Sequence, residues 1–337
     1  MRSFIVSLVL LAVLLLPLTP GLAQDEVLTI YSGRNESLIG PLLESFSDIS
    51  GIEIAVLYGG TSSLAAQILE EGANSPADIF IAQDAGALGA LAKAGLLAEL
   101  PEELTAQVSD PAFVSPDGLW LGLSGRARVL VYGPEALAEA GLELPDSILD
   151  LTGEEWQGRV GWAPTNGSFQ ANVTAMRQLL GDEATLAWMQ AMIANDVQPY
   201  PKNTPIVQAV IDGEIVAGLV NHYYLFRFLA EDPSITAQLH WFPGGDPGAL
   251  VNIAGAAIPL TSGNPAAAQA LIDFMLGEVG QTWFTTKTFE YPVVAGIEPA
   301  AELIPLADIE TPELDLSDLD DLAGTLELIE ESGALDQ

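Results

Sequence analysis

The chain has 337 residues, of which 46 are acidic and 10 basic, giving a formal net charge of -36. Its length suggests about two domains of about 150 residues each, and a hydrophobic content of 49% excludes wholesale disorder. So acidic a chain argues against nucleic-acid binding, because neutralising phosphates requires clustered Lys and Arg. The absence of cysteine excludes disulfides, thiolate metal sites and a cysteine nucleophile.

The N-terminus has the pattern of an export signal. A positive start at Arg2 is followed by an apolar run over residues 4–16, and small residues precede a cleavage site after Ala23. The apolar run is shorter than the about 20 residues that a membrane-spanning helix needs, which favours a cleaved signal over an uncleaved anchor. We therefore expect residues 1–23 to be a signal peptide and the mature chain to be periplasmic or extracellular.

The first third of the mature chain alternates strands and helices. Short apolar stretches predict strands at 27–31, 52–58 and 77–82. Apolar residues at helical spacing predict one helix from Glu36 that is stopped by Gly51, another capped by Thr61, and a third around 88–96. This alternation predicts a mostly parallel sheet with helices on both faces, which binds ligands at the carboxyl ends of its strands.

The same alternation resumes after residue 123. Further strands are predicted at 129–132, 160–162, 215–220 and 250–259. Further helices are predicted up to Leu180, around 186–192, and near 266–275 and 280–286. The acidic tail at 308–321 is interpreted as a solvated helix or loop face.

Several segments between these elements resemble the ferric-ion-binding proteins that deliver iron to ABC importers. In chain order, the segments are residues 31–34, 75–80, 124–129, 164–169, 221–224, 246–251 and 290–292. The resemblance implies an α/β two-lobed periplasmic-binding-protein fold of type II-like form, in which each lobe is a mostly parallel sheet flanked by helices. It further implies a first lobe of 24–124 plus 252–302 and a second lobe of 125–251 plus 303–337, with the ligand in the cleft between them.

The resemblance assigns the metal chemistry to Tyr223 and Tyr224. Ferric ion prefers anionic oxygen, and a phenolate supplies it once the metal has displaced the phenol proton. Adjacent residues on a strand point to opposite faces, so both rings can reach one ion only at a bend, such as the exit from strand 215–220 into a helix. The alternative is that they open an aromatic core stretch with Phe226 and Phe228.

Other positions depart from the family pattern. Asn35 and Gln83 stand where better-known bacterial members place a His and a Glu ligand, and Asn166 stands where some relatives have an additional Tyr. Two phenolates do not satisfy a ferric ion, which takes about six donors. The remaining donors must come from an anion, from water, or from a nearby carboxylate such as Glu36 or Asp84.

The scarce arginines favour the anion. Arg34 precedes a helix N-terminus, which attracts anions, and Arg126 lies where related proteins hold carbonate or phosphate. A guanidinium can grip planar carbonate or bicarbonate with two parallel hydrogen bonds, and Asn166-Gly167-Ser168 could add backbone donors. The alternative for Arg34 and Arg126 is surface ion pairing, and Arg128 on the same strand is expected to form a structural ion pair.

Together with the sequence features, the resemblance implies an exported, monomeric solute-binding protein that captures Fe(III) with a synergistic carbonate. It would deliver this cargo to a membrane ABC permease and its ATPase, without enzymatic activity or nucleic-acid binding. One alternative is the same fold binding an oxyanion or an organic solute, such as thiamine or a polyamine, against Trp120, Trp162 or Trp241. An exported α/β enzyme is less favoured, because the chain has no catalytic fingerprint. His222 is interpreted as a supporting or surface residue and His240 as a packing residue.

Overall fold

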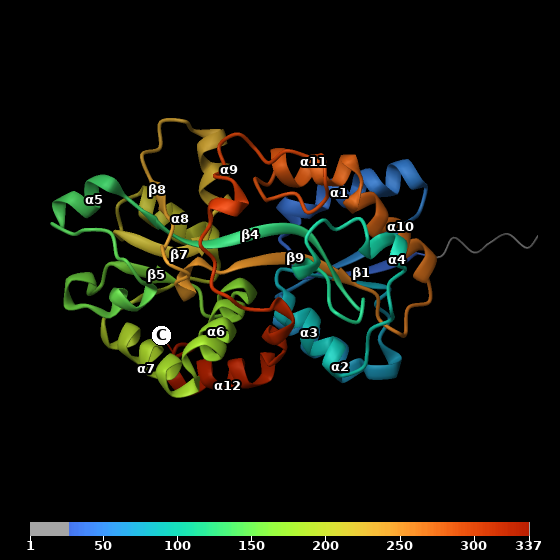
Figure 1. The fold of residues 1–337 in the computed structure, drawn as a ribbon, viewed down its shortest axis with the longest axis horizontal. Helices are drawn as coiled ribbons and strands as arrows, with labels where there is room; N and C mark the ends of the chain where they lie inside the picture. Colours follow the sequence, from blue (N-terminus) through green and yellow to red (C-terminus); the bar gives the residue numbers. More distant parts are fainter. Residues whose placement is uncertain (1–26, 337) are drawn as a thin grey trace, which may run out of the picture.

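The computed structural model describes residues 27–336, which form a central mixed sheet with helices on both faces (Figure 1). The strand order is β2-β1-β3-β9-β4-β7-β5-β6, and β8 also pairs with β4. The strands are β1 (Leu28–Ser32), β2 (Ile54–Tyr58), β3 (Ile79–Ala82), β4 (Leu121–Tyr132), β5 (Val160–Trp162), β6 (Gln198–Pro199), β7 (Ala217–Asn221), β8 (Gln238–His240) and β9 (Val251–Ala257). The predicted signal peptide at 1–23 lies outside the described residues.

Helices cover both faces of the sheet (Figure 1). They are α1 (Glu36–Ser50), α2 (Thr61–Glu71), α3 (Ala85–Lys93), α4 (Glu102–Thr105), α5 (Pro134–Glu139), α6 (Gly167–Leu180), α7 (Asp182–Ala194), α8 (Asn203–Ile211), α9 (Tyr223–Glu231), α10 (Pro265–Leu276), α11 (Glu278–Thr286) and α12 (Leu322–Ser332). None of the described helices combines the length and apolar character needed to cross a bilayer.

The strand–helix alternation of the first third is confirmed. Strands β1, β2 and β3 pair in parallel, and α1 ends at Gly51, whose left-handed backbone closes the helix as predicted. The predicted cap of α2 is wrong, because Gly60 is the N-cap and Thr61 is the first helical residue. The Thr61 hydroxyl instead accepts a bond from the Gln83 N–H at 3.3 Å and donates to the Gly33 carbonyl at 3.4 Å. It therefore ties together the loops that follow β1 and β3.

Two long antiparallel strands, β4 and β9, join the two halves of the molecule (Figure 1). Their register runs from Leu121 opposite Ala256 to Ala127 opposite Val251. Strand β3 pairs with the far end of β9, and β7 pairs with the far end of β4. The apolar pattern predicted only residues 129–132 of β4, because polar residues earlier in the strand interrupt the pattern, although Arg126 and Arg128 were also expected on this strand. All twelve residues of β4 are nevertheless buried.

The acidic tail and the helix α12 that follows it pack against different halves. Leu316 and Leu319 belong to the core cluster around β1, β3 and α1, whereas Leu328 and Ile329 of α12 belong to the cluster around α6 and α7. The acidic residues at 308–318 are exposed, as a solvated face requires. The sequence analysis did not predict α12 as a helix. The predicted lobe limits, including the return to the second lobe at 303, stay a prediction.

Candidate ligand-binding cleft

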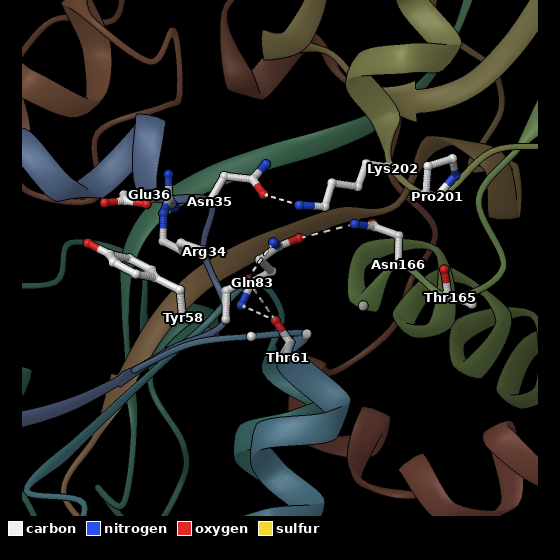
Figure 2. Close-up of a pocket in the computed structure, with 14 residues that line it drawn as sticks. Arg34, Asn35, Glu36, Tyr58, Thr61, Gln83, Thr165, Asn166, Pro201 and Lys202 are labelled. Carbon is white, nitrogen blue, oxygen red and sulfur yellow. Dashed lines mark hydrogen bonds between the residues drawn. The ribbon is translucent and has the colours of Figure 1, made fainter. Parts of the chain in front are cut away.

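A cavity of about 360 Å³ opens between the strand ends of the two halves (Figure 2). One wall is made by residues 33–36, 58–61 and 83, which follow β1, β2 and β3. The opposite wall is made by residues 165–167 and 201–202, which follow β5 and β6. The cavity therefore lies at the carboxyl ends of parallel strands, where an open α/β sheet is expected to bind its ligand.

Hydrogen bonds between side chains span this cleft (Figure 2). Lys202 Nζ donates to Asn35 Oδ1 at 3.4 Å, and Asn166 Nδ2 donates to Gln83 Oε1 at 3.4 Å. Asn35, Gln83 and Asn166 thus all line the cavity. In this arrangement they bond across the cleft and hold the two walls together.

Glycines allow close packing beside the cavity. A Cβ atom at Gly167, the first residue of α6, would lie 2.8 Å from Asp84 Oδ2 of the opposite half, so this glycine lets the two walls approach each other. A Cβ atom at Gly33 would lie 2.9 Å from the Cα atom of Thr61, so this glycine lets two loops of the same wall pack together.

Tyr223 and Tyr224 lie where β7 turns into α9, at the predicted bend. Their rings are stacked with centroids 4.3 Å apart, and each is only 1% exposed. Burial and the neighbouring Tyr223 raise the pKa of Tyr224 well above its usual value. The Tyr224 hydroxyl has no hydrogen-bond partner among the described residues, and neither tyrosine lines the described cavity. Their role as metal ligands stays a prediction.

Arg34 and Arg126 meet at a carboxylate that the sequence analysis did not assign to the site. Arg34 Nη2 donates to Glu290 Oε2 at 2.6 Å, and Arg126 Nη2 donates to Glu290 Oε1. All three side chains are buried, so the alternative of surface pairing is wrong for both arginines. Burial raises the pKa of Glu290, but the charges of Arg34 and Arg126 outweigh it and lower this pKa to about 2. The available signal was the segment 290–292, which was noticed only for its resemblance.

Arg128 does not form the structural ion pair expected of it. Its Nη1 donates to Asn203 Oδ1 at 3.4 Å and to Asn221 Oδ1 at 3.2 Å, and no described carboxylate pairs with it. Burial lowers the pKa of this guanidinium to about 10. Its Nε and Nη2 atoms are buried without a hydrogen-bond partner among the described residues. An unpaired buried cation of this kind is a candidate functional group.

The two asparagines around Arg128 also organise the predicted anion loop. Asn203 Nδ2 donates to Asn166 Oδ1 at 3.1 Å, and Asn221 Nδ2 donates to Ser168 Oγ at 3.2 Å. Asn166 is the N-cap of α6 and accepts the Ser168 N–H at 3.1 Å. The structure thus brings Arg128 and residues 166–168 into one polar network. Sequence reasoning missed Asn203 and Asn221, because an isolated asparagine carries no local signal.

His222 supports the site from the interior. Its Nδ1 accepts the Ala127 N–H at 3.1 Å, and its Nε2 donates to the Phe289 carbonyl at 2.9 Å, since a carbonyl can only accept. Burial lowers the pKa of His222 to about 4, so the ring is neutral near pH 7. Both nitrogens are occupied, which fits the predicted supporting role and rules out its surface alternative. His240 Nε2 lies 2.7 Å from the Pro145 carbonyl.

The described cavity is lined by no tryptophan on which an organic solute could stack, and by no cluster of carboxylates. Trp120 and Trp162 are buried in separate cores, and Trp241 packs against two of the core clusters. The aromatic residue that lines the cavity is Tyr58. No group of three or more His, Cys, Asp or Glu residues that could hold a metal occurs between residues 27 and 336.

The two carboxylates considered as additional metal donors, Glu36 and Asp84, differ in their surroundings. Glu36, at the start of α1, lines the cavity. Asp84 is buried and accepts the Ala87 N–H at 2.9 Å as the N-cap of α3. Burial raises the pKa of Asp84 to about 6, and its Oδ2 has no hydrogen-bond partner among the described residues.

Comparison with known proteins identifies the family. The pattern of the bacterial extracellular solute-binding proteins matches residues 42–311. The chain belongs to this family. A Serratia marcescens protein named Fe(3+)-binding periplasmic protein is 35% identical over 316 residues, covering 93% of this chain and 92% of its own length. The major ferric iron-binding protein of Neisseria meningitidis is 34% identical over 329 residues, covering 96% of this chain and 97% of its own.

Solved structures agree with the assignment to the solute-binding proteins. Iron-bound HitA from Pseudomonas aeruginosa superimposes with a TM-score of 0.85 at 36% identity, covering 91% of this chain and 99% of its own. The predicted two-lobed α/β fold is therefore confirmed. The prediction of a solute-binding protein rather than an enzyme is also confirmed.

Proposed function

We propose that this solute-binding protein captures Fe(III) between its lobes, with Tyr223 and Tyr224 as phenolate ligands. The observation that carries the proposal is the pair of stacked, buried tyrosines at the end of β7, with the Arg126 guanidinium 5.7 Å from the Tyr223 ring centroid. A ferric ion can displace the phenol proton, and the resulting phenolate is an oxygen donor that hard ferric ion prefers. The names of the relatives in Serratia and Neisseria support the same cargo.

The charge balance supports a synergistic carbonate or bicarbonate. Three positive charges are buried here, on Arg34, Arg126 and Arg128. They face one negative charge on Glu290 and, when Asp84 is ionised, a second one on that residue. A ferric ion bound by two phenolates adds a further positive charge, so the complete site stays positive. A dianion offsets this excess. Because burying an uncompensated charge is costly, we infer that the cargo enters together with an anion.

Unpartnered donors indicate how the anion would be held. The Nε atoms of Arg34, Arg126 and Arg128 are all buried without a hydrogen-bond partner among the described residues. Buried N–H groups are rarely left unpaired in a finished site. We propose that these arginines, together with the Asn166-Gly167-Ser168 turn at the start of α6, hold the carbonate.

Membership of the solute-binding family supports a role in transport. We propose that the protein is exported after cleavage of residues 1–23, works as a monomer outside the cytoplasmic membrane, and presents iron to an ABC permease with its ATPase. The lobes are proposed to be 24–124 plus 252–302 and 125–251 plus 303–337. They would close over the cargo by a hinge motion, with β4 and β9 as the connecting strands.

Spectroscopy tests the ligand assignment. Purified mature protein should develop a visible phenolate-to-iron charge-transfer band when Fe(III) and bicarbonate are added. The combined Tyr223→Phe and Tyr224→Phe variant should lose this band, whereas Tyr58→Phe, which alters an aromatic residue of the cavity wall, should keep it. No band in the unmutated protein, together with thermal stabilisation by thiamine or a polyamine, would refute the proposal.

The anion is tested separately. Removing bicarbonate, or replacing Arg34 and Arg126 by Gln, should weaken iron binding. Iron affinity that is unchanged by both treatments would rule out carbonate as a synergistic ligand, while leaving the tyrosine assignment intact.

A further inference from the structure

Among the described residues, Glu290 is the carboxylate that accepts hydrogen bonds from both Arg34 and Arg126. Its side chain is completely buried, and it accepts from Arg34 Nη1 at 3.1 Å, from Arg34 Nη2 at 2.6 Å and from Arg126 Nη2. The Thr288 hydroxyl donates a further bond at 2.7 Å. Arg34 follows β1 and Arg126 lies within β4, so one carboxylate links the cleft wall to the strand that joins the halves.

The residues beside Glu290 contact the tyrosine side of the site. Phe289 has a positive φ of 57°, and its carbonyl accepts the bond from His222, the residue directly before Tyr223. On the other side, Tyr291 and Gly125 exchange two backbone bonds, at 2.8 and 2.9 Å. The segment is thus fixed both to the start of α9 and to β4 next to Arg126.

Glu290 also determines which edge of each guanidinium is occupied. Arg126 Nη1 donates to the Gln83 carbonyl at 2.5 Å, and its Nη2 is bound to Glu290. Both terminal nitrogens of Arg34 are bound to Glu290. The Ser124 hydroxyl accepts a further bond from each arginine, at 3.4 Å, whereas the Nε atom of each has no partner in the described residues.

We propose that Glu290 is the positioning residue that sets how strongly iron binding depends on an external anion. It holds the two guanidiniums in one arrangement that leaves their Nε atoms without a partner and able to donate to an anion, and it offsets one positive charge near the ferric ion. This inference rests on the proposed function, and it assigns Glu290 an action through Arg34 and Arg126 rather than direct contact with iron.

The charge of Glu290, not its volume, is the decisive property. Glu290→Gln keeps the size of the side chain but leaves both arginines uncompensated. The iron affinity measured without bicarbonate should fall by at least about tenfold, because an added positive charge repels the cation. The stimulation of iron binding by bicarbonate should grow, since the anion then replaces the missing charge. Glu290→Asp keeps the charge and should retain most of the affinity without bicarbonate.

The experiment compares iron affinity and charge-transfer band with and without bicarbonate in the unmutated protein, Glu290→Gln and Glu290→Asp. The matched control is Asp78→Asn. Asp78 is also a buried carboxylate, but it accepts hydrogen bonds from the backbone N–H of Thr29 at 2.8 Å and of Asn264 at 2.9 Å. The control should lower the melting temperature while leaving the bicarbonate dependence unchanged. A purely structural role for Glu290 predicts the same behaviour for Glu290→Gln.

A double variant keeps the test decisive if Glu290→Gln does not fold. Arg126→Gln with Glu290→Gln removes one charge of each sign, so its iron affinity without bicarbonate should stay within about threefold of that of the unmutated protein. A loss of about tenfold or more in this double variant would overturn the inference, as would an unchanged bicarbonate dependence in Glu290→Gln. A missing band in the unmutated protein would instead refute the proposed function itself.

Discussion

The buried arginines of the cleft differ in how their charge is compensated. Arg34 and Arg126 share Glu290, whereas Arg128 lies in the same buried region and is held by the neutral side chains of Asn203 and Asn221. The pKa of Arg34 is raised, because its attraction to Glu290 outweighs the lowering effect of burial. Burial lowers the pKa of Arg128 to about 10. Arg34 and Arg126 thus share one counter-charge that the chain supplies, whereas Arg128 has none among the described residues.

The same contrast separates two buried acids. Glu290 has two cationic partners, whereas Asp84 has an oxygen without a hydrogen-bond partner among the described residues. Desolvation disfavours the charged form of any buried group, and only a partner reverses the effect. Paired charges therefore fix the framework of the site, and the unpaired ones identify where a ligand can still contribute.

The largest effect is expected from breaking the pair. Replacing Arg34 and Arg126 together by Met should lower the free energy of unfolding by about 3–5 kcal/mol, because Glu290 is left as an unpaired buried charge. Arg128→Met should change it by no more than about 1 kcal/mol, since the lost amide bonds are offset by the removal of a desolvated cation. Urea unfolding of the iron-free proteins at neutral pH measures both. Equal losses in the two variants would show that the distinction between paired and unpaired arginines is wrong.

A second contrast concerns pH. The pKa of Asp84 is near 3.8 when unfolded and about 6 in the fold. The folded state therefore binds the proton more tightly, and the stability contributed by Asp84 falls as the pH rises from about 4 to 6. Asp84→Asn removes this penalty and should stabilise the iron-free protein by about 3 kcal/mol above pH 6, with little effect near pH 4.

Glu290 should behave in the opposite direction. Its pKa is lowered from 4.5 to about 2, so its contribution is complete above about pH 4.5 and is lost as the pH falls towards 2. The measurement for both acids is the free energy of unfolding from pH 3 to 8. An Asp84→Asn difference that does not change between pH 4 and 6 would contradict the assigned desolvation.

The elements of the fold were largely predictable, because buried strands and helices leave periodic apolar patterns. The sheet β1–β3 and the helices α1, α6 and α10 follow such patterns. Strand β4 was recognised only at its end, since Ser124 and Arg126 break its apolar run. Helices α8 and α12 were missed altogether. The bend before Tyr223 was predictable because a strand pattern ends there.

The partners of the arginines were not predictable in the same way. Glu290 contacts residues 256 and 164 positions away, at Arg34 and Arg126. No local pattern encodes such a contact, and it arises only when β4 and the segment after α11 meet in the fold. The small number of basic residues indicated that Arg34 and Arg126 could have a role in binding an anion. It did not indicate that the chain itself supplies a carboxylate to them.

The smallest expected effect is that of salt on the melting temperature, which acts through the exposed acids and not through the buried charges. The described ion pairs use only four acids, Glu290, Asp182, Asp320 and Asp321, although the chain contains 46. The exposed acids therefore repel one another, and salt screens charges at the surface far more than buried ones. Raising NaCl from about 0.05 to 1 M should increase the melting temperature of the iron-free protein by about 2–4 °C, equivalent to about 1 kcal/mol.

The same salt titration distinguishes the interior from the exterior. The melting-temperature difference between Arg128→Met and the unmutated protein should stay constant as salt is added, because Arg128 is buried. If that difference shrank with salt, Arg128 would be interacting mainly with the surface acids, and its charge could not be counted as uncompensated within the site.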